Sequence, residues 1–217
     1  MGRNWWVIPV LLLFIASWIL IVIGFSITLF ESPVVYGKNY GGRRITKLTV
    51  LGFIGIDVDV PIEGANFTWV TKMDYFHYYV DLTVQLPYGF APQHVFQKYN
   101  FDDIPCKEFT SKMKVGQVFT LFSIFACLFS IVFLIAVIFI RSLLLLLCVW
   151  IFGWITVICN AVSVGTLFYV YLNGFCVDDR PTRIPPGLQF SMPAGGTALF
   201  CLAAVMLLMG MIVSSIL

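Results

Sequence analysis

Residues 115–172 read VGQVFTLFSIFACLFSIVFLIAVIFIRSLLLLLCVWIFGWITVICNAVSVGTLFYVYL, two long apolar runs divided by a single charged residue, Arg141. A helix needs roughly 20 apolar residues to cross a hydrocarbon core about 30 Å thick. Both runs are longer than that. The stretch therefore predicts two membrane-spanning helices, over residues 115–140 and 142–172, joined by a very short link.

Two further uncharged runs lie outward from this stretch, at residues 4–30 and 195–217. The whole chain is 60% hydrophobic and 11% charged, whereas a soluble domain is roughly half apolar and about a quarter charged. The first run exceeds the roughly 7–15 apolar residues of a cleaved signal peptide, so we expect it to remain as a helix. The sequence predicts an all-α four-helix transmembrane bundle in an integral, multi-pass membrane protein.

The position of the net charge of +2 predicts which way the chain faces. The loops at residues 31–114 and 173–194 are each neutral, so the excess lies on Arg3 and Arg141. Four spans place these two arginines on one side, which the positive-inside rule assigns to the cytosol. We therefore expect cytosolic N- and C-termini, two external loops, and residence in the plasma membrane or a secretory-pathway membrane. So small a charge also argues against nucleic-acid partners.

The first external loop, residues 31–114, is long enough to fold by itself. Apolar and polar residues alternate over residues 47–60 and again over 77–86, the pattern of half-buried strands. A proline, a glycine and an asparagine in residues 61–66 predict a turn, so we expect a hairpin between the two runs. The loop is thus predicted to be a small antiparallel β ectodomain.

Three features of the external segments are candidate sites. Asn66-Phe67-Thr68 is an N-glycosylation acceptor. Cys106 and Cys176 both fall on the oxidising side and are predicted to form a disulfide. A cluster of aromatic residues is either the core of the ectodomain or a contact face; its members are Trp69, Tyr75, Phe76, Tyr78 and Tyr79.

Small and polar residues within the spans are expected to hold the helices together, because helices in lipid associate through close packing and hydrogen bonds. The residues predicted to do so are Asn160, Ala161, Gly165, Ser123, Ser130, Gly210 and Ser214.

No pattern in the sequence predicts catalysis. It contains no glycine-rich phosphate loop, no nucleophile elbow and no cluster of metal-ligand residues, and its only histidines are His77 and His94. We expect a protein that is not an enzyme and that holds neither a cofactor nor a metal.

The layout resembles that of claudins, which also carry their large loop between the first two spans, and more closely that of amastins, four-span surface glycoproteins of kinetoplastid parasites. Residues 48–52 (LTVLG) are similar to the centre of the amastin signature, and residues 117–125 and 160–179 resemble the family's second and third helices. Lys47 and Asp57 stand where the signature has cysteines. The resemblance implies a cell-surface protein without catalytic chemistry, acting at a host–parasite interface.

These observations predict a non-enzymatic membrane surface glycoprotein with a structural or interaction role. Its expected partners are membrane lipids and either lateral membrane proteins or further copies of itself. The alternative is an accessory subunit of a larger membrane assembly, such as a respiratory, channel or transporter complex.

Overall fold

The computed structural model describes residues 7–31, 35–38, 45–50, 54–60, 66–85, 91–100, 107–140, 142–172 and 195–216. The chain divides into two compact units. The helical unit comprises Met1–Ile27, Lys112–Tyr169 and Ala194–Leu217, and the β unit comprises Thr28–Ser111 and Val170–Pro193.

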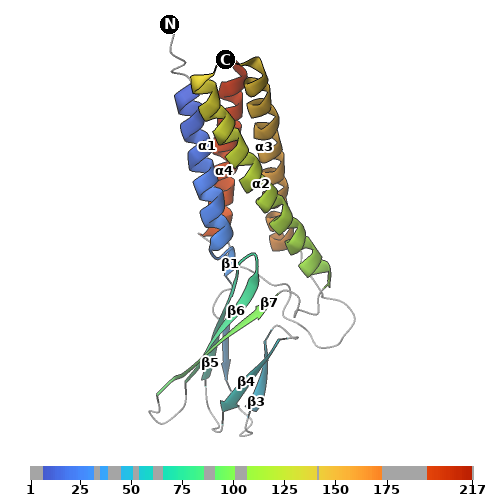
Figure 1. Ribbon diagram of the computed structural model, residues 1–217. Coiled ribbons are helices and arrows are strands. Elements are labelled where there is room, and N and C mark those ends of the chain that lie inside the picture. Colours follow the sequence, from blue (N-terminus) through green and yellow to red (C-terminus); the bar gives the residue numbers. More distant parts are fainter. Residues whose placement is uncertain are drawn as a thin grey trace. The chain divides into compact units, whose positions relative to one another are not determined.

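Four helices are long and apolar enough to cross a membrane, as the uninterrupted apolar runs predict. They are α1 (Val7–Ser26), α2 (Lys107–Phe139), α3 (Leu143–Leu172) and α4 (Gly196–Ile216), and they lie alongside one another in the helical unit (Figure 1). Successive helices run in opposite directions, so the start of α1, the α2–α3 link and the end of α4 lie at one end of the bundle. The chain is thus a multi-pass membrane protein by the length and composition of its helices.

Helix α2 begins at Lys107 rather than at Val115, where the apolar run starts. Nothing between these residues breaks a helix, and Glu108 in the first turn favours the helix N-terminus electrostatically. Its 33 residues span about 50 Å, more than the roughly 30 Å of hydrocarbon. Near this end the Lys112 ammonium lies 5.2 Å from the ring centroid of Tyr169 on α3, a cation–π contact that joins the two helices.

The core of the bundle centres on Phe14 of α1, a fully buried side chain. A Cβ atom on Gly210 of α4 would lie 3.1 Å from the Phe14 ring, and one on Gly153 of α3 would lie 3.3 Å from the same ring. Cys127 of α2 directs its thiol at the Phe14 carbonyl oxygen, 3.6 Å away. One aromatic residue therefore contacts all three other helices, two of them at glycines.

Hydroxyl groups join α2 to α3 inside the bundle. The hydroxyls of Thr120 and Ser163 are 2.6 Å apart, and Ser123 donates to the carbonyl oxygen of Thr156 at 3.3 Å. All four residues are buried. Such bonds favour association between helices in lipid, where the hydrophobic effect contributes little.

The described strands of the β unit form two antiparallel sheets. In the larger sheet, β5 (Asn66–Met73) pairs with β6 (His77–Gln85), which pairs with β7 (Gln93–Asn100). The short strands β1 (Phe30–Glu31) and β2 (Val35–Lys38) pair with the other edge of β5. The smaller sheet is a hairpin of β3 (Ile45–Val50) and β4 (Ile54–Val60).

The prediction that residues 47–60 form one strand paired with residues 77–86 is wrong. These residues fold back on themselves as β3 and β4, and β6 pairs with β5 and β7 instead. In the β3–β4 register Leu48 opposes Ile56 and Val50 opposes Ile54, so each pair from Lys47 to Val50 joins two residues of the same parity. Alternation therefore continues unchanged through the hairpin and cannot distinguish it from one long strand.

The predicted alternation along β6 is confirmed. Tyr78, Val80, Leu82 and Val84 are buried, whereas their neighbours along the strand are exposed or half-buried. One face of the larger sheet is therefore core, and the other is available for contact.

Candidate functional site

The available face of the larger sheet carries a group of aromatic and charged side chains around the β5–β6 hairpin. We call this group the aromatic patch; its members are Asp74, Phe76, His77, Tyr79, Phe96 and Lys98. Phe76 is 44% exposed and Phe96 is 65% exposed. Large apolar rings that remain this open on a folded sheet are typical of a contact surface.

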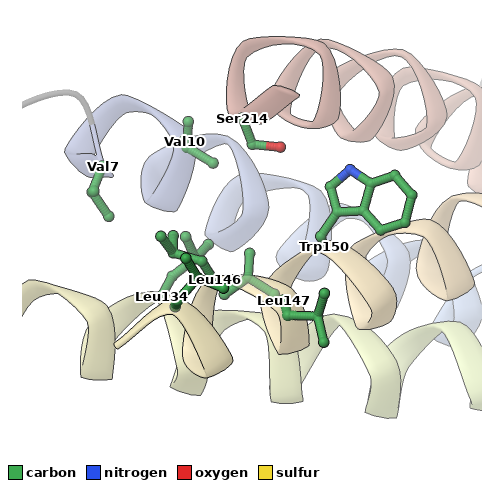
Figure 2. Close-up of a pocket in the computed structure, with 9 residues that line it drawn as sticks. Val7, Val10, Leu134, Leu146, Leu147, Trp150 and Ser214 are labelled. Carbon is green, nitrogen blue, oxygen red and sulfur yellow. The ribbon is translucent and has the colours of Figure 1, made fainter. Parts of the chain in front are cut away.

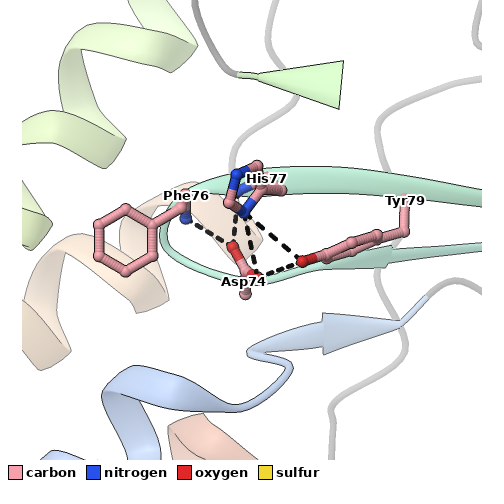
Figure 3. Close-up of polar contacts among 4 residues, drawn as sticks. All are labelled: Asp74, Phe76, His77 and Tyr79. Atoms are coloured by element: carbon pink, nitrogen blue, oxygen red, sulfur yellow. Dashed lines mark hydrogen bonds and ion pairs between the residues drawn. The ribbon is translucent and has the colours of Figure 1, made fainter. Parts of the chain in front are cut away.

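Asp74 holds the hairpin turn in place (Figure 3). Its Oδ1 accepts hydrogen bonds from the backbone N–H groups of Phe76 and His77, each at 2.6 Å. The Asp74 N–H in turn donates to the carbonyl oxygen of His77 at 3.1 Å. Aspartate is favoured at such turns because its carboxylate satisfies backbone donors that no strand partner reaches. The turn that presents Phe76 is therefore held by both the carboxylate and the backbone N–H of Asp74.

The second carboxylate oxygen of Asp74 anchors the aromatic side of the patch. Tyr79 donates its hydroxyl to Asp74 Oδ2 at 2.8 Å, and the same hydroxyl lies 3.5 Å from His77 Nδ1 (Figure 3). His77 Nδ1 is also 3.6 Å from Asp74 Oδ2, which becomes an ion pair when the imidazole is protonated. The three side chains form one connected polar network.

Strand β7 completes the patch from the other side of β6. Phe96 stacks on Tyr79 with ring centroids 5.8 Å apart and an interplanar angle of 25°. Lys98, which opposes Tyr79 in the β6–β7 register, places its ammonium 5.7 Å from the same ring centroid. Tyr79 is thus the centre of the patch, in contact with a carboxylate, an aromatic ring and a cation.

Within the patch the polar side chains bond to one another, whereas the Phe76 and Phe96 rings are exposed. The Asp74 carboxylate is occupied by two backbone donors and the Tyr79 hydroxyl, and its side chain is only 15% exposed. Within the described residues no three His, Cys, Asp or Glu side chains are placed to hold a metal ion. The polar network positions the rings, and the exposed rings and Lys98 are the groups that another molecule would meet.

Burial together with the hydrogen bond to Asp74 and the charge of that carboxylate raises the pKa of Tyr79 to about 12. Because this pKa is higher in the folded than in the unfolded chain, the contribution of Tyr79 to stability is complete below about pH 10 and is lost as the pH rises towards 12. We expect an absorbance titration at 295 nm of the Tyr79→Phe variant to lack one late-ionising tyrosine. An unchanged high-pH limb would contradict the raised pKa of Tyr79.

The structure separates the five aromatic residues predicted as core or contact face. Tyr75 and Tyr78 are fully buried and belong to the core, and burial raises the pKa of Tyr78. Phe76 and Tyr79 lie in the patch. Trp69 opposes Leu82 in the register, which places its backbone on the buried parity of β5, and its side chain lies outside the described residues.

Sequence reasoning missed Phe96 and Lys98. The signal that could have found them is the alternation in residues 93–100, where His94, Phe96 and Lys98 share one parity. This parity identifies a face shared with Tyr79 only when the β6–β7 register is known, because that register sets Lys98 opposite Tyr79.

The other predicted external sites are Asn66 and the pair Cys106 and Cys176. Asn66 is exposed and is the first residue of β5, so it begins a strand rather than lying in a turn. Cys106 and Cys176 lie outside the described residues.

The residues predicted to pack the helices make contacts of different kinds. Asn160 is buried and donates from Nδ2 to the Phe200 carbonyl oxygen at 3.4 Å, and Gly210 adjoins Phe14. Ser123 bonds across to α3, while Ser130 and Ser214 bond within their own helices.

Ala161 and Gly165 lie on an exposed face of α3. Both are exposed, and a Cβ on Gly165 would have no described atom within 4 Å. Gly153, which was not predicted, takes the close-packed position on α3 instead.

No protein-family model matches this sequence, and no curated protein matches it significantly.

Proposed function

We propose that this chain is a non-enzymatic, multi-pass membrane surface protein whose aromatic patch binds another protein. The observation that carries the proposal is the exposure of Phe76, on the turn held by Asp74, together with that of Phe96, which stacks on Tyr79 from β7 as Lys98 does. Aromatic residues are enriched in protein interfaces. A turn held by its own hydrogen bonds also loses little conformational freedom when a partner binds.

The orientation we propose places the β unit outside and both termini in the cytosol. Arg3 precedes α1 and Arg141 lies between α2 and α3, so four spans would place both on one side of the membrane. The positive-inside rule assigns that side to the cytosol. The amastin-like resemblance points to the same arrangement, a surface glycoprotein at a host–parasite interface. The claudin-like layout and the Cys106–Cys176 disulfide belong to this proposal as well.

Photocrosslinking tests the patch directly. We expect a photoreactive phenylalanine at Phe96 to form a discrete adduct in native membranes, because this ring is the most exposed of the patch. The same probe at Gln85, exposed near the opposite end of β6, should give none. Phe96→Ala should weaken binding of the captured partner at least tenfold, about 1.4 kcal/mol.

The control substitution for this measurement is Gln85→Ala, which should leave binding unchanged. Adducts of equal yield at both positions would show non-specific contact. Absence of an adduct at Phe96 in intact membranes would remove the proposed interaction surface.

Glycosylation of Asn66 tests the orientation. We expect glycosidase treatment of the protein from its native membranes to increase its gel mobility, and Asn66→Gln to produce the same faster band without treatment. Exposure of Asn66 makes it accessible to the transferase. A mobility that neither treatment changes would argue against the external placement of the β unit.

A second candidate function is the accessory subunit of a larger membrane assembly. The exposed Ala161 and Gly165 on α3 favour it, since small residues with open space beside them allow a neighbouring helix to approach. Isolation of the native particle distinguishes the two: a stoichiometric set of membrane subunits along α3 supports the assembly, and a free chain supports the surface protein.

A further inference from the structure

The helical unit contains an apolar cavity of about 310 Å³ at the end where α1 and α3 begin and α2 and α4 end. Residues from all four helices line it, including Val10 of α1, Leu134 of α2, Leu146 and Trp150 of α3, and Ser214 of α4 (Figure 2). A cavity of this size is within the range of small-molecule sites, so its lining indicates what it can hold.

The lining excludes charged and strongly polar ligands. Among the described residues that line the cavity, Ser214 and Trp150 alone supply side-chain polar atoms, and the Ser214 hydroxyl already donates to the Met211 carbonyl oxygen at 2.8 Å. The remaining lining side chains are valine and leucine. A phosphate, a sugar or an ion would lose its hydration here and gain nothing in return, whereas a hydrocarbon chain would lose no hydrogen bonds.

The cavity has a closed inner wall and an open outer wall. Val7, Val10 and Val149 on the inner side are buried, whereas Leu143 is 84% exposed and Leu147 and Trp150 are also exposed. These residues belong to helices that can span a membrane, so the medium that meets the open wall is the hydrocarbon of one leaflet. An acyl chain can enter sideways from that leaflet without crossing water.

An empty cavity would also leave its walls without van der Waals partners on one side. The surrounding leaflet supplies the one abundant occupant of matching chemistry. We propose that this cavity binds an acyl chain of a phospholipid from the adjacent leaflet, with the chain inserted between α1 and the first turns of α3.

Photolabelling with a lipid tests the proposal. The full-length protein is placed in nanodiscs of phosphatidylcholine that contain a small fraction of phosphatidylcholine with a diazirine on one acyl chain, and labelled peptides are mapped after irradiation. We expect labels to concentrate on the peptides that carry Val10 and Leu146. Leu146→Trp, which fills the cavity, should reduce labelling of these peptides at least fivefold.

The matched control is Leu144→Trp, on the same helix at a residue that is 68% exposed and does not line the cavity. It should leave the labelling within twofold of the parent. Labels spread evenly along the exposed helix faces, or equal labelling in both variants, would overturn the proposal.

A second pair guards against misfolding of Leu146→Trp. Leu147 lines the cavity and Ile151 does not, although both residues are exposed. Leu147→Trp is therefore the test variant and Ile151→Trp its control. The same fivefold and twofold outcomes are expected. A parallel arm uses a diazirine-bearing free fatty acid, and labelling of the cavity by that probe without labelling by the phospholipid would overturn the assignment to a phospholipid.

Discussion

Replacing Gly153 with leucine is expected to destabilise the helical unit more than any other single substitution considered. The first added atom alone, Cβ, would lie 2.4 Å from Met211 Sδ and 3.3 Å from Phe14 Cζ, and leucine adds three more. Overpacking of a closed core typically costs 1–3 kcal/mol. We expect about 3 kcal/mol, measured as a lower midpoint of thermal unfolding of the purified full chain in detergent, by roughly 6–12 °C.

The matched control lies on the same helix. Gly165→Leu makes the same change where a Cβ meets no described atom within 4 Å, so its effect should stay within about 0.5 kcal/mol. Because helix propensity changes equally in both variants, the difference between them reports packing alone. The double variant Gly153→Ala, Met211→Ala should be more stable than Gly153→Ala alone. Equal losses of stability in Gly153→Leu and Gly165→Leu would contradict the proposed core.

Asp74→Ala is expected to release the β5–β6 hairpin. The substitution removes the acceptor of two backbone N–H groups, those of Phe76 and His77, and of the Tyr79 hydroxyl. Loss of such bonds from a mostly buried carboxylate costs roughly 2 kcal/mol, which corresponds to about a 30-fold faster amide exchange. Hydrogen–deuterium exchange followed by mass spectrometry of the hairpin peptide measures this change.

Asp81→Ala provides the comparison for Asp74→Ala. Asp81 is exposed and lies on the face of β6 that carries Tyr79, so its replacement should leave the amide exchange of the hairpin nearly unchanged. Asp74→Ala should also abolish the adduct at Phe96 if that ring is recognised in its present position. Exchange that is equally slow in both variants would show that the turn does not depend on the carboxylate.

The helices were predictable because their signal is length. An uncharged run of more than about 20 residues has few alternatives to a membrane span, and all four runs became helices. The same apolarity conceals which face of each helix points inward, since lipid and core select similar residues. Ala161 and Gly165 therefore had the same pattern as a packing pair yet face outward, while the close-packed Gly153 had no distinguishing pattern.

The sheet was predictable only where each face had a distinct chemistry. Along β6 the apolar and polar parities are clearly separated, and burial follows them. In β5 a polar residue, Thr71, occupies the buried parity and Val70 the opposite one, so the strand lacked a clean alternation. The aromatic patch depends on the β6–β7 register as well, and residues far apart in sequence had to be aligned before Phe96 and Tyr79 became neighbours.

The central position of Phe14 also affects how the protein is made. Helix α1 is synthesised before the other three described helices, yet its closest packing partner among them is α4, which follows the others in the chain. Until then, Gly24 and the Phe14 ring have no α4 to pack against, although both are covered by it in the finished bundle. Final closure of the bundle must therefore follow translation of the entire helical unit, and a ribosome stalled before α4 would leave three inserted helices with an unfilled core.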